Sequence, residues 1–440
     1  MSSFPDEQSR SAALARRAAQ VLPGGNTRTT VYHAPYPIYA ASGEGCRIVD
    51  VDGVERIDLL NNYTALLHGH RHGPTLEAVQ AQLGKGFSFA HPTEWEITHA
   101  EILCSRVPSV ERVRYMNSGT EAVMTAIKAA HAYTGRPKIA KCEGVYHGSY
   151  DPVEVSLETP PEAWGEGPPP SHPYWPGMPA HVLDAVVVIP FNDLAGTRAA
   201  LTPHAGELAA IIVDLMPNRS GLIPMNADYL HFLRDFTHEH GIVLIFDEVI
   251  TLRVAAGGMQ SLLGVQPDLT TMGKVIGGGF AVGAVGGSAE VMEVFSPARG
   301  KPALPHGGTF NANPVTMAAG VAALQAWDEA AASRLNALGD QAREACRAAF
   351  RRAEVPGQVT GQGSLLMLHP HDRPLRNYRD SLRRPEEKAM MTRLHQELIN
   401  EGLLISPTGL TCLSTPMGEG EVAHLGEGLL AALKRLRQGG

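Results

Sequence analysis

Short apolar runs alternate with helical patterns through the middle of the chain, from about residue 70 to residue 320. Continuous apolar runs of this length are typical of strands in a mostly parallel sheet whose two faces are covered by helices. The pattern predicts strands at Val113–Asn117, Lys138–Cys142, Ala185–Pro190, Ala209–Asp214 and Ile242–Asp247, and helices at Thr93–Arg106, Glu121–Tyr133 and Ala227–His240. Thr93 and Glu96 have the spacing of a capping box at the start of the first helix. The predicted fold class is α/β.

Both ends of the chain differ from this middle part. Residues 9–21 predict an amphipathic helix, followed by strand-like pieces at 36–40, 46–50 and 56–60, with a turn at Asp52-Gly53. Helical patterns near Ala331–Arg352 and Glu386–Glu401 predict a smaller α/β lobe. We therefore expect an N-terminal segment of residues 1–69 that contributes to the small domain, a large domain of residues 70–320, and a C-terminal small domain of residues 321–440.

Composition excludes several classes of function. The 440 residues carry a net charge of −8, with a pI near 6.2, so nothing favours binding to nucleic acid or to an anionic membrane. The 5 cysteines are widely spaced, which is typical of free thiols in a reducing compartment. We see no signal core, no membrane-spanning run and no cluster of histidines and carboxylates for a metal, and we expect a cytoplasmic protein.

One segment has the features of a phosphate site. Asn117-Ser118-Gly119-Thr120-Glu121-Ala122 follows a predicted strand and opens a predicted helix. Free N–H groups at a helix N-terminus bind phosphate, and the Ser118 and Thr120 hydroxyls would add donors. An ordinary helix cap has the same composition, so the segment by itself leaves both interpretations open.

Two more segments suggest contacts to a flat, phosphorylated ligand. Gly144-Val145-Tyr146-His147-Gly148 follows the next strand and would present the Tyr146 ring for stacking, although a buried structural tyrosine would look the same. The glycine-rich turn Pro305–Asn311 carries Thr309, which could complete a phosphate site from elsewhere in an assembly.

Lys274 is the most informative residue. It lies in a glycine-rich turn, and Asp247 ends an earlier buried strand. A lysine amine that forms a Schiff base with the aldehyde of pyridoxal phosphate, together with a carboxylate that keeps the pyridine nitrogen protonated, is the pairing that this cofactor requires. The motifs occur in one order along the chain, mostly at strand ends, where open α/β sheets bind ligands.

These segments, with Pro23–Arg28, Phe246–Ile250 and Gly277–Gly279, resemble the class III aminotransferases of fold type I. More narrowly, they resemble the branch of glutamate-1-semialdehyde aminomutase and the β-phenylalanine aminotransferases. The resemblance implies a seven-stranded, mostly parallel sheet between helices and a small domain built from both chain ends. It also implies a homodimer with shared active sites.

The resemblance also implies roles for individual residues. Lys274 would hold the cofactor and move the proton, and Asp247 would pair with the pyridine nitrogen. The other cofactor-binding residues implied are the phosphate ligands Ser118, Gly119 and Thr120, the stacking residue Tyr146, His147 next to it, Val249 on the opposite ring face, and Thr309 on the neighbouring subunit's phosphate.

Substrate recognition is implied at Arg28, because a guanidinium group binds a carboxylate through two parallel hydrogen bonds. Two positions depart from the family pattern. Asp214 stands where the family often has a Glu-Pro pair, with Arg219 nearby. Thr408 replaces an arginine that helps the β-phenylalanine enzymes recognise a second carboxylate, which puts a dicarboxylate acceptor in doubt. Pyruvate could be the acceptor instead, or Arg219 or Arg253 could compensate.

The expected function is transfer of the amino group of a carboxylate-bearing, β- or other non-standard amino acid to an oxo acid. The alternatives are an aminomutase or racemase of the glutamate-1-semialdehyde type, an amine transaminase, a decarboxylase, or a non-catalytic protein that retains the fold. A transaminase needs an acceptor for multiple turnover, whereas an aminomutase or racemase does not.

Overall fold

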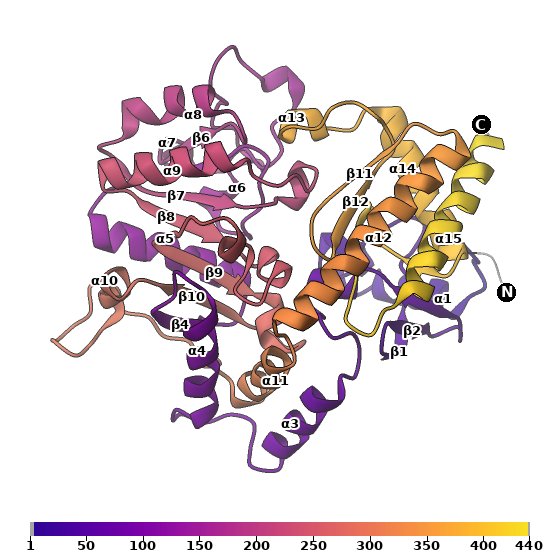
Figure 1. The fold of residues 1–440 in the computed structure, drawn as a ribbon, viewed down its shortest axis with the longest axis horizontal. Helices are drawn as coiled ribbons and strands as arrows, with labels where there is room; N and C mark the ends of the chain where they lie inside the picture. The colour runs from indigo at the N-terminus through magenta and orange to yellow at the C-terminus, as the bar shows by residue number, and fades with distance from the viewer. Residues whose placement is uncertain (1–3, 439–440) are drawn as a thin grey trace. The chain divides into compact units, whose positions relative to one another are not determined.

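The chain divides into two compact units in the computed structural model, which describes residues 4–438. The larger unit comprises residues 74–333 and 373–382, and the smaller unit comprises residues 4–73, 334–372 and 383–438. The smaller unit is therefore built from both ends of the chain, as expected. Figure 1 shows the elements of each unit, coloured along the chain.

A seven-stranded sheet forms the centre of the larger unit, with the strand order β4-β10-β9-β8-β7-β5-β6. Its strands are β4 (Arg112–Met116), β5 (Lys138–Cys142), β6 (Val186–Ile189), β7 (Leu208–Asp214), β8 (Val243–Asp247), β9 (Leu269–Gly273) and β10 (Gly283–Gly287). Strand β10 runs in the opposite direction to the other six strands. The carboxyl ends of β4, β5, β7, β8 and β9 consequently lie at one edge of the sheet.

The predicted strands in this sheet are confirmed to within about a residue at most ends, but β9 and β10 were not expected. The sequence of β10, Gly-Ala-Val-Gly-Gly, carries little strand propensity. It forms a strand because β4 and β9 pair with it on both sides along its whole length.

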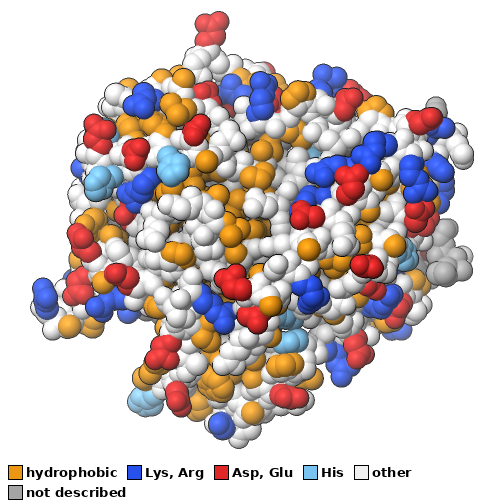
Figure 2. All heavy atoms as spheres, in the orientation of Figure 1, with side chains coloured by type: hydrophobic (Ala, Val, Ile, Leu, Met, Phe, Trp, Pro, Cys, Tyr) orange, Lys and Arg blue, Asp and Glu red, His pale blue; other side chains and the backbone are white. Residues whose placement is uncertain are grey.

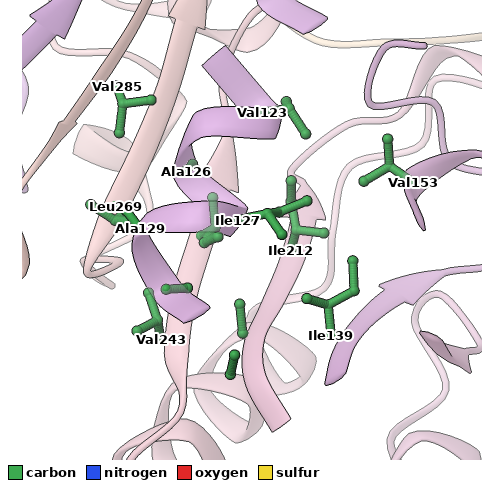
Figure 3. Close-up of a cluster of buried hydrophobic side chains, with 14 of the residues drawn as sticks. Val123, Ala126, Ile127, Ala129, Ile139, Val153, Ile212, Val243, Leu269 and Val285 are labelled. Atoms are coloured by element: carbon green, nitrogen blue, oxygen red, sulfur yellow. The ribbon is translucent and has the colours of Figure 1, made fainter. Parts of the chain in front are cut away.

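Helices of the larger unit cover this sheet, and a hydrophobic core lies between helices and strands. The helices are α3 (Gly73–Leu83), α4 (Glu94–Arg106), α5 (Gly119–Thr134), α6 (Asp151–Glu154), α7 (Ala180–Asp184), α8 (Leu194–Leu201), α9 (Ala227–His240), α10 (Ala289–Met292), α11 (Pro314–Gln325) and α13 (Tyr378–Ser381). Figure 3 shows how Val123, Ala126 and Ile127 on one face of α5 meet strand residues such as Ile139 and Ile212. This packing fixes the first turn of α5 at the end of β4.

The smaller unit contains two small sheets. In the first, β1 (Ala40–Glu44), β2 (Arg47–Asp50) and β3 (Glu55–Asp58) are antiparallel, and β13 (Leu403–Leu404) adds parallel to β3. The second has the order β11 (Gln358–Thr360), β12 (Leu365–His369), β14 (Leu410–Cys412). The helices are α1 (Arg10–Ala18), α2 (Asn61–Thr64), α12 (Glu329–Ala353), α14 (Pro385–Asn400) and α15 (Glu419–Gln438).

Three local features differ from the sequence predictions. The first strand lies at Ala40–Glu44 and not at residues 36–40. The Thr93 side chain makes no capping hydrogen bond at the start of α4, so the predicted capping box is wrong. The larger unit also extends beyond residues 70–320, because the almost wholly buried helix α11 belongs to it, as does the excursion 373–382.

Charges of both signs are interspersed on the face of the molecule in Figure 2. Within residues 4–438, no helix combines the length and the apolar character needed to span a bilayer.

Candidate active site

The predicted cofactor residues lie in the larger unit, and most of them follow strands whose carboxyl ends share one edge of the sheet. Ser118 comes two residues after β4, Tyr146 follows β5, Asp247 ends β8, and Lys274 follows β9 directly. Parallel strands bring these distant residues together, which periodicity in the sequence could not establish.

The start of α5 has the donors that a phosphate group needs. Ser118 is the N-cap, and its hydroxyl accepts a hydrogen bond from the amide of Glu121 at 3.1 Å. The amides of Gly119 and Thr120 have no acceptor among residues 4–438. The Thr120 hydroxyl accepts from the Ser149 amide at 3.2 Å, so its proton is free to donate to a ligand.

Val249 lies between this loop and the lysine turn. A Cβ atom added to Gly119 would lie 3.1 Å from Val249 Cγ1, and one added to Gly273 would lie 3.4 Å from the same atom. Glycine at residue 119 therefore lets the loop approach Val249 closely. Val249 is partly buried, as a residue that packs against a flat ligand would be.

Asp247 is held from three directions. Its Oδ1 accepts from the Val249 amide at 3.1 Å and from the Thr271 hydroxyl at 3.0 Å, and its Oδ2 lies 2.8 Å from His147 Nδ1. Asp247 and His147 are both buried. His147 Nε2 is buried without a hydrogen-bond partner in the described chain, so this imidazole is committed to Asp247 alone.

Asp214 places a second carboxyl group beside Asp247. The two residues pair in register at the ends of β7 and β8. Burial raises the pKa of Asp214 well above its usual range, and the charge of Asp247 raises it further. The raised pKa favours a proton on Asp214.

Lys274 brings an amine to this edge of the sheet. Burial lowers the pKa of its amine, while Asp247 and Asp214 oppose that shift. Its backbone has a φ of 48°, a left-handed conformation that is unfavourable for a residue with a side chain and is concentrated at functional sites.

Tyr146 is exposed for 39% of its surface, which excludes the alternative of a buried structural tyrosine. The loop that carries it is held from behind. Glu143 is buried and accepts from Arg379 Nε at 2.7 Å, and the Arg379 guanidinium lies 4.9 Å from the centroid of the Trp164 ring. The excursion 373–382 thus braces the strand end that precedes Tyr146.

Thr309 is exposed and lines a groove of about 490 Å³ together with Phe89, Phe310 and their neighbours. Asn311 Oδ1 accepts from Asn117 Nδ2 at 2.9 Å, which ties this turn to the residue before Ser118.

Arg28 belongs to the smaller unit. Its Nη2 donates to Asn62 Oδ1 at 3.0 Å, and its guanidinium carbon lies 5.7 Å from the centroid of the Tyr63 ring. Arg219, which was considered as a pocket charge, pairs with Glu158. Arg253 is fully buried.

The family model for class III aminotransferases, described as "Aminotransferase class-III", matches residues 29–418. The chain belongs to the class III aminotransferases. A transaminase whose structure contains pyridoxal phosphate is 45% identical over 98% of this chain, and pyridoxal phosphate is the cofactor of this protein as well. The site fits that group: amides without acceptors at the start of α5, a fixed carboxylate at Asp247, and a lysine of lowered pKa share one edge of the sheet.

Known class III proteins resemble the chain over nearly its full length. Glutamate-1-semialdehyde 2,1-aminomutase of Ignicoccus hospitalis is 39% identical, over 97% of this chain and 99% of that protein. The crystal structure of an omega-transaminase from Sphaerobacter thermophilus is 56% identical, with a TM-score of 0.96 over 98% of this chain and 99% of that one. A β-phenylalanine aminotransferase from Variovorax paradoxus is 35% identical, with a TM-score of 0.86 over 98% and 94%.

Sequence reasoning placed His147 among the cofactor residues but gave it no task. Its hydrogen bond to Asp247 joins residues 100 positions apart, and no pattern in the neighbouring sequence predicts it. The brace from Arg379 to Glu143 was also missed, because 236 positions separate these residues.

Proposed function

We propose that this class III enzyme is an aminotransferase that moves the amino group of a carboxylate-bearing amino acid, of the β- or another non-standard class, to an oxo acid. The observation that carries the proposal is the meeting of Lys274, Asp247 and the open amides of α5 at one edge of the sheet. The similarity to transaminases of known structure, at 56% and 35% identity, supports the type of reaction.

Pyridoxal phosphate, when bound, accepts the electron pair released at the substrate carbon that carries the amino group. Asp247 holds a proton at the pyridine nitrogen, and His147 and Thr271 keep the carboxylate of Asp247 in place. Burial lowers the pKa of the Lys274 amine, which favours its neutral form. The neutral amine would take a proton from that carbon and deliver it to the cofactor. The amides of Gly119 and Thr120 bind the phosphate.

Arg28 binds the substrate carboxylate in this proposal. Within residues 4–438 its guanidinium forms no ion pair with a carboxylate and donates to one acceptor, Asn62. A guanidinium group whose other N–H donors are available suits the carboxylate of a ligand.

Pyruvate is the proposed acceptor. Thr408 supplies no charge for a second carboxylate, and Glu158 already neutralises Arg219. The cation beside Thr408 is Arg383, whose Nη2 donates to the Thr408 carbonyl oxygen at 2.7 Å and to that of Leu368 at 3.2 Å. If 2-oxoglutarate proves the better acceptor, this proposal for the acceptor is wrong, and Arg383→Ala would then show whether Arg383 binds the second carboxylate.

A homodimer is proposed as the functional unit. Phe310 is exposed for 60% of its surface, and Phe87 and Phe89 are also exposed, which is unusual for large apolar side chains near one groove. A second copy that covers this groove would bring Thr309 to the neighbouring phosphate site. Sedimentation analysis of the wild type and Phe310→Asp tests this, and a monomeric wild type with full cofactor affinity would refute it.

The first test uses purified holoenzyme with β-phenylalanine and no oxo acid. The visible absorbance of the lysine-bound cofactor should bleach to a near-ultraviolet band, and pyruvate should restore it. Lys274→Ala is the control and should show no such cycle. A visible band that β-phenylalanine and other carboxylated donors all leave unchanged would contradict the aminotransferase proposal.

The second candidate function is the aminomutase reaction, which the names of the curated relatives favour. Incubation with glutamate-1-semialdehyde and no oxo acid decides between the two. Multiple turnover to the isomer with the amino group on the neighbouring carbon would support the aminomutase. Turnover that requires an added oxo acid supports the aminotransferase.

A further inference from the structure

Four consecutive residues of the smaller unit have a left-handed backbone. The φ angles of Asn61, Asn62, Tyr63 and Thr64 are 49°, 48°, 53° and 73°, and none of these residues is glycine. Left-handed turns are unfavourable for residues with a Cβ atom and persist only where the surroundings enforce them. Backbone strain of this kind is concentrated at functional sites, so the contacts that this turn makes possible indicate what it does.

The surroundings hold the first end of this turn through hydrogen bonds, and the last residue is buried. Asp58 Oδ1 accepts from the amides of Leu60 at 3.0 Å and Asn61 at 2.8 Å. Asn61 Nδ2 donates to the Cys412 carbonyl oxygen at 3.0 Å. Asn61 and Thr64 are buried, whereas Asn62 is exposed and Tyr63 is partly exposed. The buried ends fix the turn, and its two middle side chains point away from the core.

Both middle side chains engage Arg28. Asn62 Oδ1 accepts from Arg28 Nη2 at 3.0 Å, and the Arg28 guanidinium carbon lies 5.7 Å from the Tyr63 ring centroid, within the range of a cation–π contact. The Tyr63 hydroxyl donates to the Thr30 carbonyl oxygen, two residues beyond Arg28, which fixes the ring. A right-handed turn would direct these two side chains elsewhere.

We propose that the left-handed turn Asn61–Thr64 is a positioning device for Arg28, in which Asn62 and Tyr63 fix the guanidinium group so that its remaining N–H groups receive a substrate carboxylate. The inference rests on the proposed function, since it assumes that Arg28 binds that carboxylate. A free arginine side chain loses much rotamer freedom when it binds a ligand, and a guanidinium already held loses less. The turn therefore increases the affinity for carboxylated substrates and leaves that for amines unchanged.

The decisive variant is Asn62→Gly. Glycine adopts positive φ readily, so the backbone of the turn is retained while the amide that holds Arg28 is removed. The matched control is Asn192→Gly, which replaces another asparagine of positive φ (59°) in the larger unit. Tyr63→Leu tests the ring, and Arg28→Ala defines complete loss of the carboxylate contact.

The probe is 3-phenylpropanoate, which is β-phenylalanine without its amino group, bound to holoenzyme and measured by calorimetry. Asn62→Gly and Tyr63→Leu should each weaken binding about three- to ten-fold, as expected for the ordering of one long side chain. The KM for β-phenylalanine should rise by a similar factor at unchanged kcat, and the KM for 1-phenylethylamine should not change. Thermal unfolding should show no loss of stability in Asn62→Gly.

Unchanged 3-phenylpropanoate binding in both Asn62→Gly and Tyr63→Leu, with clear loss in Arg28→Ala, would overturn the inference and leave the proposed function standing. Equal effects on β-phenylalanine and on 1-phenylethylamine, which lacks the carboxylate, would overturn it as well, because they indicate a general structural role. If the wild type binds no 3-phenylpropanoate and transaminates only amines, the proposed substrate class fails together with the inference.

Discussion

Strand β10 supports the phosphate-binding loop through a glycine that has no room for a side chain. A Cβ atom on Gly283 would overlap the Ser118 carbonyl oxygen and would lie 2.6 Å from its carbonyl carbon, whereas real Cβ atoms essentially never come closer than 3.0 Å. In Gly283→Ala the backbone at Ser118 must therefore move, since a backbone group cannot rotate away.

Two effects of Gly283→Ala are expected. Overpacking should lower the free energy of unfolding of the cofactor-free protein by about 1–3 kcal/mol. The shifted loop should also misdirect the Gly119 and Thr120 amides. Loss of one charge-assisted hydrogen bond of about 1.5–3 kcal/mol corresponds to a roughly 10- to 150-fold rise in the dissociation constant of pyridoxal phosphate.

Gly286→Ala is the matched control in the same strand. Its Cβ atom would lie 2.7 Å from both methyl groups of Val110, so it overpacks side chains and leaves the phosphate loop alone. Both variants should lose stability, but only Gly283→Ala should bind the cofactor weakly in an absorbance titration. Equal dissociation constants for the two variants, or an unchanged constant in Gly283→Ala, would refute the reasoning.

Four further outcomes are expected. Lys274→Ala should abolish multiple turnover and the visible absorbance band in a cofactor spectrum. Asp247→Asn should lower kcat/KM about 100-fold or more, because the negative charge beside the pyridine nitrogen is lost; near-normal rates would contradict this. Arg379→Ala leaves the carboxylate of Glu143 buried and unpaired and should cost about 3 kcal/mol in urea unfolding, most of it recovered by adding Glu143→Gln. Burial lowers the pKa of His99 to about 4, so the unfolded chain binds a proton at a higher pH than the folded protein does. The free energy of unfolding should therefore fall as the pH drops from about 6.5 to about 4, by up to ~1.4 kcal/mol per pH unit. A His99→Gln variant with the same pH slope would contradict this.

Local pattern was sufficient for much of the larger unit. The strands β5 and β8 and the helix α9 lie where apolar runs and helical periodicity predicted them. The two strands are buried on both faces of the sheet, so they appear as continuous apolar runs. Helix α9 buries one face, so its apolar residues recur with the helical period. The order of the motifs was also present in the sequence, and most of the motifs lie at strand ends.

Local pattern failed where distant residues decide the conformation. Strand β10 is a strand because β4 and β9 pair with it. Thr93 and Glu96 have the right spacing for a capping box, but the Thr93 hydroxyl makes no capping bond. The segment 373–382 packs in the larger unit through Arg379 and Tyr378, although the residues on either side of it belong to the smaller one.

The sequence by itself determined the fold class, because buried strands and helices leave recognisable apolar patterns. Its motifs carried the resemblance to the family and marked the residues at which chemistry was expected. The tertiary structure alone decided how those residues are held. It joined His147 to Asp247 and set Asp214 beside Asp247. It also turned Asn62 and Tyr63 toward Arg28 in a left-handed conformation, although neither residue is a glycine. These contacts bring together residues far apart in the chain, and their energies depend on burial and geometry, which a linear pattern does not contain.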